Sequence, residues 1–287
     1  MRQFRQFTQH LVEATPGKPF NIQMAEPFPS ASSFENLSSG KLQLMWIASA
    51  AFVTKEYAFT LLSHPPFVSL DRYLQWRAQP MTVKAVDSLY AKYEMKALPC
   101  AVIDGNPDFV LRRVPDADYR LKGAKVGMNG PLREIYAATG ITPIALPVSE
   151  LARSMETGIL DGVHTFSPHE TIELRLYDYT KAVIYPSAVR GFTVTELMMN
   201  LAFWNGLDAS DRAAIEGVCR RMVSESIKSS RKLADDAIER YRKAGTVVMT
   251  MSELDVQLIR QKWEEVAAKR AAFEPAFEQL YKSLYDK

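Results

Sequence analysis

The stretch from Tyr119 to Thr165 constrains what this chain can fold into more than any other part of it. It alternates short β-type runs with short helical segments, and glycines at 140 and 158 end the helical segments. This alternation predicts a compact α/β unit. The stretch carries no nucleophile–base pair, no phosphate-binding loop and no metal-ligand spacing. It therefore favours binding over catalysis.

Length and composition indicate an ordinary globular protein with two lobes. The chain has 287 residues, which is long for a single core, and it is 47% hydrophobic and 24% charged. Its net charge is +2, with basic and acidic residues interleaved, which excludes a nucleic-acid-binding footprint. No run approaches the roughly 20 apolar residues of a membrane span. The opening residues lack the apolar core of a secretory signal, so we expect any export signal to lie upstream.

Hydrophobic periodicity predicts the order of elements in the first part of the chain. A helix opens it, followed by a strand at 19–24, a short helix at 32–39 and a buried strand at 41–47. A strand–helix–strand unit of this kind favours a parallel sheet. A further strand is predicted at 96–104.

Two features of the second half predict how the lobes are connected. Residues 181–201 form one extended run, longer than a single sheet normally uses and interrupted near Pro186 and Gly191, so we interpret it as crossing between lobes. The region from Asp208 to Gly245 reads as one helix, and about 36 residues would span roughly 54 Å, enough to brace both lobes. Pro275 should kink or break the C-terminal helix.

Isolated residues in apolar surroundings are the next candidates for a site. Glu196 lies between apolar residues of the extended run, where a carboxylate is costly to bury unless it is paired or binds a cation; a solvated position is the alternative. Arg190, six residues earlier, is a candidate with the same two alternatives, a ligand-binding role or a solvated position. Aromatic residues near loops, such as Phe52 and Phe166, usually belong to the core, although some could line a ligand cleft.

The histidines and cysteines give no clear sign of chemistry. His164, His169 and Glu170 are close in sequence, but Pro168 prevents the helical spacing that would align them on a metal. Cys100 lies in a predicted buried strand without the signature of a catalytic cysteine.

The chain has two cysteines, Cys100 and Cys219, which are too few for a disulfide framework. We expect two buried or half-buried free thiols, and sequence alone cannot judge whether they form a bridge.

Several motifs resemble those of the extracytoplasmic solute-binding proteins of TRAP transporters. The segments LLSHPPF and YPSAVRGFTVTELMMNLAFWNGL resemble the branch of that family that binds 2-oxo acids and related carboxylates. The resemblance covers nearly the whole chain, except that the family's first strand, before the opening helix, is missing. The strand motif of the family corresponds to Leu121–Lys125, and its Gly-x-x-Pro motif corresponds to Gly140–Pro143. Its glutamate-containing helix corresponds to Ser149–Gly158, and its Asp-Gly pair corresponds to Asp161–Gly162.

The resemblance implies a two-lobe, periplasmic-binding-protein-like α/β fold with crossing hinge strands and a long bracing helix. It also implies a periplasmic protein, monomeric or homodimeric, that delivers a ligand to the membrane subunits of a TRAP permease without catalysis. We assign residues 1–111 to lobe I, 112–190 to lobe II, 191–245 to the return strand and long helix of lobe I, and 246–287 to a strand and helices that pack across the lobes.

The chain departs from the family at the ligand-binding positions. The arginine that usually binds the ligand carboxylate is replaced by Gly127, which cannot form a guanidinium–carboxylate pair. The branch's glutamine and tryptophan correspond to Asn106 and Thr165, with Phe166 beside the latter. The branch's glutamate is kept as Glu196, and in the branch it helps hold a cation. Glu196 is therefore the metal candidate, for Na⁺ or Ca²⁺, while the three substitutions argue against a cation-bridged carboxylate.

We therefore predict a small organic anion held by an arginine other than the usual one. Arg190 is the first candidate, with Arg113 and Arg112 next, and His164 is included in the predicted site. A neutral or more apolar ligand is the alternative, because Gly127 removes a charge and frees volume. A sensory module without a permease is a second alternative, and an enzyme is the least favoured.

Overall fold

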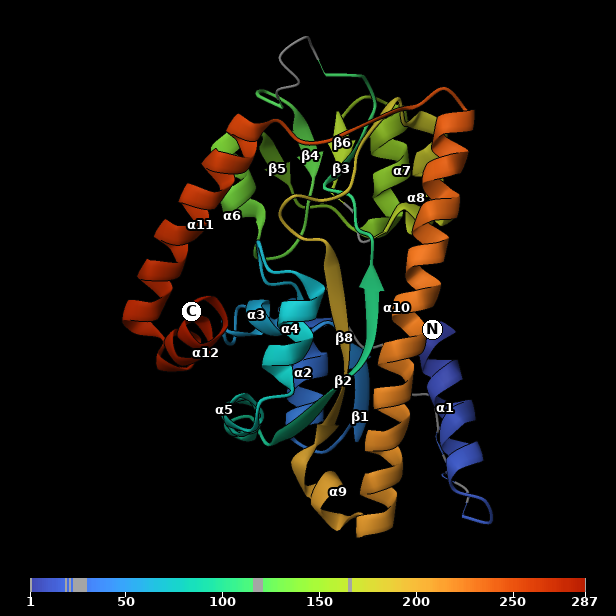
Figure 1. Ribbon diagram of the computed structural model, residues 1–287, viewed down its shortest axis with the longest axis vertical. Helices are drawn as coiled ribbons and strands as arrows, with labels where there is room; N and C mark the ends of the chain where they lie inside the picture. The colour runs from blue at the N-terminus through green and yellow to red at the C-terminus, as the bar shows by residue number, and fades with distance from the viewer. Residues whose placement is uncertain are drawn as a thin grey trace.

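Two separate β-sheets organise the chain, and each lies at the centre of one lobe (Figure 1). The structure is a computed structural model that describes residues 2–18, 20, 22, 30–115, 121–164 and 167–286. Lobe I surrounds a sheet with the order β1-β8-β2, and lobe II surrounds a sheet with the order β5-β4-β6-β3-β7-β9. Among these residues no helix is both long enough and apolar enough to cross a membrane.

The sheet of lobe I is antiparallel. β8 (Phe192–Asn200) lies between β1 (Leu44–Ile47) and β2 (Met95–Asp104) and runs opposite to both. The predicted parallel pairing of 41–47 is therefore wrong for the described strands, and most of the predicted strand 19–24 lies outside them. The helices of this lobe are α1 (Arg2–Ala14), α2 (Ser30–Ser38), η1 (Ser49–Phe52), α3 (Phe59–Ser63), α4 (Leu70–Arg77), α5 (Pro80–Ala91) and α9 (Leu201–Gly206).

The sheet of lobe II is mixed. β4 pairs in parallel with β5 and β6, β3 pairs antiparallel with β6 and β7, and β9 joins β7 in parallel. The strands are β3 (Phe109–Leu111), β4 (Lys125–Gly127), β5 (Thr142–Ile144), β6 (Gly162–Val163), β7 (Ala182–Ile184) and β9 (Val247–Met249). The helices are α6 (Arg133–Tyr136), η2 (Ala137–Thr139), α7 (Val148–Glu156), α8 (Pro168–Glu173) and η3 (Leu176–Tyr179).

The chain passes from lobe I to lobe II after β2 and returns between β7 and β8, in agreement with the predicted crossing within 181–201. The predicted long helix is α10 (Ala209–Lys243), which runs along both lobes (Figure 1). The Asp208 side chain accepts a hydrogen bond from the Asp211 amide at its start, and Gly245, with φ +78°, follows its end.

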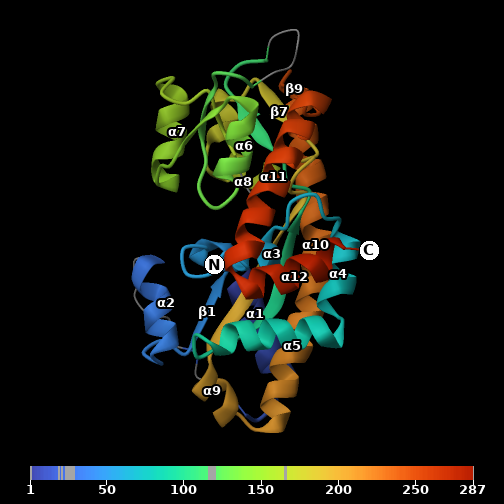
Figure 2. The same cartoon turned by 90° about the vertical axis from the view of Figure 1, so that its left-hand side faces the viewer.

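The C-terminal helices also connect the lobes. α11 (Glu253–Phe273) starts in lobe II and packs against α6, and α12 (Pro275–Tyr285) lies across α4 and α5 of lobe I (Figure 2). The break between them falls at Glu274, because Pro275 has no amide hydrogen to continue the ladder of α11. The predicted break at Pro275 is confirmed.

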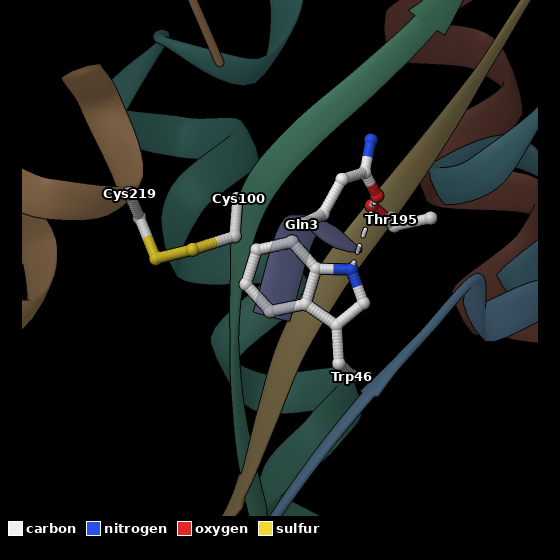
Figure 3. Close-up of a disulfide and its surroundings, with 5 residues drawn as sticks. All are labelled: Gln3, Trp46, Cys100, Thr195 and Cys219. Atoms are coloured by element: carbon white, nitrogen blue, oxygen red, sulfur yellow. Dashed lines mark hydrogen bonds between the residues drawn. A yellow bond between two sulfur atoms is a disulfide. The ribbon is translucent and has the colours of Figure 1, made fainter. Parts of the chain in front are cut away.

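A β-bulge in β2 directs Cys100 toward α10. Pro99 pairs with Glu196 and Ala101 pairs with Thr195, so Cys100 is the extra residue between them. Cys100 forms a disulfide with Cys219 of α10 (Figure 3), and both side chains are buried. The expectation of two free thiols is therefore wrong. Spacing alone could not show this, because the pair is separated by 119 residues.

Helix α1 covers the same region of lobe I. The Gln3 Oε1 atom accepts hydrogen bonds from Trp46 Nε1 and Thr195 Oγ1, both at 3.4 Å (Figure 3). Trp46 also packs against Phe4 and Phe7 of α1. The opening helix is thus held on the sheet by the aromatic contacts of Phe4 and Phe7 and by the side-chain amide of Gln3.

The disulfide predicts a reductant-sensitive stability. Reduction should lower the free energy of unfolding by about 2–5 kcal/mol, because a cross-link that closes a loop of this length restricts the unfolded chain. Urea unfolding with and without reductant measures the change. The double variant Cys100→Ala/Cys219→Ala is the control and should not respond to reductant. Equal stability of the natural chain in both conditions would contradict the prediction.

Candidate functional site

Two segments that connect the lobes are hydrogen-bonded to each other. The amides of Gly105 and Asn106 donate to the Gly191 carbonyl at 3.1 and 3.0 Å, and the Ser187 amide donates to the Asn106 carbonyl at 2.9 Å. Gly105 has φ +78°, a conformation that favours glycine, and this lets the chain turn directly after β2. The two segments therefore form one structured hinge.

Asp108 fixes the shape of the second hinge segment. Its buried carboxylate accepts hydrogen bonds from the Tyr136 and Ser187 hydroxyls and, at 2.9 Å, from the Ala188 amide. Burial raises the pKa of Asp108, while these donors and the Arg190 charge act in the opposite direction. The Ser187 hydroxyl in turn accepts from the Arg190 amide at 2.7 Å. Asp108 thereby positions the backbone from which the Arg190 side chain extends.

Arg190 places a guanidinium in this buried hinge. Its side chain is only 3% exposed, and Nη1 donates to Thr193 Oγ1 at 3.2 Å. Asn106 Nδ2 donates to the same hydroxyl oxygen, also at 3.2 Å. Burial lowers the pKa of Arg190, whereas Tyr136, Asp108 and Glu170 raise it, and an arginine remains cationic in proteins.

Two histidines from opposite lobes lie in the electrostatic field of Arg190. His64 follows α3 of lobe I, and His164 follows β6 of lobe II. Burial, then the Arg190 charge, lowers the pKa of His64 to about 3 and that of His164 well below its usual value. The Phe67 amide donates to the Val189 carbonyl at 2.8 Å, which ties the loop after His64 to the segment that carries Arg190.

The predicted residues Arg190, Asn106 and His164 therefore share one region between the lobes. The predicted residues Thr165 and Phe166 follow His164 but lie outside the described residues. His169 forms an ion pair with Glu173 on α8, while His164 Nδ1 bonds to the Asp108 carbonyl at 2.7 Å.

Sequence reasoning missed Asp108, Tyr136, Ser187 and His64. Asp108 and Tyr136 are 28 residues apart, and the fold alone brings them together. The one available signal was His64, a histidine in front of two prolines in a motif with family resemblance.

Glu196 has a different environment, inside lobe I. It is fully buried, accepts from the Tyr90 hydroxyl at 2.6 Å and forms an ion pair with Arg77 at 3.3 Å. The Arg77 side chain is itself only 8% exposed. Glu196 is therefore a paired core carboxylate, and the alternative of a solvated position on the strand is wrong.

The surroundings of Glu196 do not fit a cation site. Its charged partner is a guanidinium, and both carboxylate oxygens have protein donors. Within the described ranges no three His, Cys, Asp or Glu side chains are grouped so that they could hold a metal ion. The predicted role of Glu196 as a Na⁺ or Ca²⁺ ligand thus has no support in its contacts.

The space beside Gly127 is filled rather than open. A Cβ atom there would lie 2.8 Å from Leu160 Cδ1 and 3.0 Å from Leu151 Cδ2. The expectation that Gly127 frees volume for a ligand is therefore wrong. Phe52 is 4% exposed and packs against Phe34 at 5.0 Å between ring centroids, within the core of lobe I.

Arg112 and Arg113 follow β3, whose other end begins directly after the hinge residue Asp108. The Arg113 side chain is 75% exposed and pairs with Asp161 at 3.0 Å. A Cβ atom at Gly158 would lie 2.9 Å from Arg112 Nη1, so Arg112 lies over the end of α7. Of the three arginines predicted as anchors, Arg190 is therefore the one that lies between the lobes.

An open hollow of about 420 Å³ lies elsewhere, where α10 passes η3. Its lining carries both charge signs, and Arg240 lies over the Tyr177 ring at 4.7 Å. We place the candidate site at the hinge, where polar groups are buried, rather than in this surface hollow. The hollow is lined by Tyr177, Asp236, Glu239, Arg240, Lys243 and Ala244.

A family model described as bacterial extracellular solute-binding protein, family 7, matches residues 3–274. A monocarboxylate 2-oxoacid-binding periplasmic protein of Nostoc is 20% identical over 260 residues, covering 88% of this chain and 71% of that protein. An ectoine-binding periplasmic protein of Halomonas elongata is 26% identical over 155 residues, 53% of this chain and 44% of that protein.

Solved structures share the fold across the whole chain. A TRAP transporter solute-binding protein of Bordetella bronchiseptica, with copurified calcium and picolinate, has a TM-score of 0.89 at 17% identity, covering 99% of this chain and 85% of that one. One of Colwellia psychrerythraea, with bound calcium and pyruvate, has a TM-score of 0.89 at 17% identity, covering 99% and 88%. At these identities the likeness establishes the two-lobe fold.

The buried ion pair of Arg77 and Glu196 predicts a large loss of stability when the arginine is replaced. Arg77→Met should lower the free energy of unfolding by about 3–5 kcal/mol, because it leaves the Glu196 carboxylate buried without its charged partner. Adding Glu196→Gln to that variant should recover much of the loss. Urea denaturation measures both effects.

The matched control is Arg113→Met, which breaks an exposed pair with Asp161 and should cost at most about 1 kcal/mol. An Arg77→Met variant no less stable than this control would show that the buried pair contributes little.

Proposed function

The chain belongs to family 7 of the bacterial extracellular solute-binding proteins, and on this basis we propose that it captures a small organic anion between its lobes for a TRAP-type membrane permease. The proposed ligand is a carboxylate, and Arg190 is its proposed anchor. The protein is proposed to act in the periplasm, to release the ligand unchanged and to catalyse no reaction. The Cys100–Cys219 disulfide supports an oxidising compartment of this kind.

The buried guanidinium of Arg190 at the hinge is the observation that carries this proposal. Arg190 lies on the segment between β7 of lobe II and β8 of lobe I. His64 reaches the same region from lobe I, and His164 and Tyr136 reach it from lobe II. A ligand bound there would contact both lobes, and it would stabilise the closed arrangement by its differential contacts with that state.

Arginine suits a carboxylate because its planar fork can donate two parallel hydrogen bonds. The usual position for such an arginine is Gly127, where Leu160 and Leu151 now occupy the space. Arg190 would supply the same chemistry from the hinge instead of from a strand of lobe II. Relatives support the ligand class, since their structures contain pyruvate, malonate and pyroglutamate.

A neutral or zwitterionic ligand is the second candidate. Asp108 and Glu170 both lie close enough to Arg190 to affect its pKa, so carboxylates of the protein can balance the guanidinium without a ligand charge. An ectoine-binding relative is consistent with this alternative. The two candidates differ in whether binding depends on the ligand's negative charge.

Replacement of Arg190 tests the anchor. Pyruvate, malonate, pyroglutamate and picolinate should be screened by thermal shift, and the affinities of those that bind should be measured by calorimetry. Arg190→Gln should weaken acid binding by at least about 30-fold, since loss of a buried charged partner costs roughly 2–5 kcal/mol. Arg113→Gln, an exposed arginine at the far end of β3, is the control and should bind as the natural chain does.

Equal binding of acids by the natural chain and by Arg190→Gln would exclude Arg190 as the anchor. Stabilisation by uncharged amides of the same acids, without any effect of the acids, would favour the neutral ligand.

A further inference from the structure

His64 and His164 come from opposite lobes to the segments that hold Arg190. The loop after His64 bonds to the Val189 carbonyl through the Phe67 amide, and His164 bonds to the Asp108 carbonyl. His64 follows α3 in lobe I, and His164 follows β6 in lobe II. Each lies in the field of Arg190, and His64 also affects the pKa of His164. Both imidazoles are therefore close to the proposed position of the ligand carboxylate.

His64 has an unused polar atom. The residue is 7% exposed, and its Nδ1 atom is buried without a hydrogen-bond partner among the residues that the structure describes. A buried polar atom of this kind costs free energy unless something satisfies it. A ligand atom at the hinge would do so.

His164 is held in one orientation. Its Nδ1 bonds to the Asp108 carbonyl at 2.7 Å, so the ring donates there and leaves Nε2 for another partner. The ring packs against Tyr136 at 5.0 Å and Phe109 at 5.7 Å between centroids. The same residue, Asp108, thus orients His164 through its carbonyl and the Arg190 segment through its carboxylate.

The charges at the hinge do not leave room for an additional anion without compensation. Arg190 supplies one positive charge, and the nearby Asp108 and Glu170 carboxyls already raise its pKa. Three hydrogen-bond donors stabilise Asp108 as a carboxylate. Burial raises the pKa of Glu170, and the Arg190 charge opposes that rise. An incoming carboxylate would add a negative charge in a region of low dielectric, where uncompensated charge is costly.

We propose that His64 and His164 contact the ligand from opposite lobes and that the pair takes up one proton as an anionic ligand binds. The inference rests on the proposed function and adds two contact residues to it. The imidazoles are neutral in the ligand-free protein, and the ligand carboxylate becomes the partner that stabilises a protonated ring. The sequence predicted His164, but not His64, as a site residue. The proposal gives both the role of contacting the ligand and taking up a proton.

The sign of the pH dependence follows from linkage. The ligand-free pKa of His64 is about 3, and a bound carboxylate raises it, so the complex holds more protons than the free protein at any pH between the two values. Affinity for the anion should therefore rise as pH falls through that window. The limit for one proton is about tenfold for each pH unit.

Calorimetry can count the proton directly. Pyruvate and pyroglutamate are suitable probes, because each has one carboxyl group, which is fully ionised at pH values well above about 4. The ligand itself therefore does not titrate in the pH range of the experiment. Binding is measured near pH 6 in buffers of different ionisation enthalpy. The expected result is net proton uptake, at most one proton for each ligand bound, that grows as the pH is lowered from about 6 toward about 5.

The variants assign the proton to the histidine pair. His64→Gln/His164→Gln should show no proton uptake and a flat dependence of Kd on pH. His169→Gln is the matched control, because that histidine is paired with Glu173 on the surface of α8, and it should behave as the natural chain does. Rings labelled with ¹⁵N report the neutral state of the pair in the ligand-free protein.

The outcomes separate this inference from the proposed function. Acids that bind tightly without proton uptake would overturn the inference and leave the proposed function intact. Uptake that persists in the double variant and disappears in Glu170→Gln would assign the proton to Glu170 and overturn the inference. Failure of every acid in the panel to bind would overturn both.

Discussion

The hydrogen bonds of the Asp108 carboxylate are the interaction on which the rest of the hinge depends. They join three parts of the chain: the segment after β2, helix α6 through Tyr136, and the loop before Arg190. A single carboxylate thereby sets the direction of both crossing segments. Because burial and the nearby Asp108 charge raise the pKa of Tyr136 well above its ordinary value, the phenol keeps its proton and remains a donor.

Arg77 and Arg190, two of the arginines that the structure describes, have buried side chains and different roles. Arg77 lies inside lobe I and is matched by Glu196, so its charge is compensated within one rigid unit. Arg190 lies between the lobes, where its Nη1 donates to the Thr193 hydroxyl and the charges of Asp108 and Glu170 act on it. A charge matched in the core stabilises the fold or specifies its packing, whereas a charge at the boundary between two lobes can respond to a ligand.

Local patterns predicted the elements that depend on local physics. The long helix after Asp208, the break at Pro275 and the crossing near Pro186 follow from hydrophobic periodicity, a missing amide hydrogen and strand length. The site was only partly predictable, because Asp108 and Tyr136 meet through tertiary structure, and Glu196 looks the same in sequence whether it faces a cation or Arg77. The Cys100 bulge depends on strand register, which composition does not report.

The proposed position of the anchor, Arg190, changes how a ligand could close this protein. An arginine at position 127 would belong to a strand of lobe II and would hold the ligand on that lobe first. Arg190 belongs to the connection itself, so a ligand held there starts between the lobes and gains His64 from one and His164 from the other. Only contacts that differ between the open and closed states can drive closure. The selectivity of such a site would therefore lie in the two imidazoles, because they come from different lobes and their contacts with a ligand change as the lobes close.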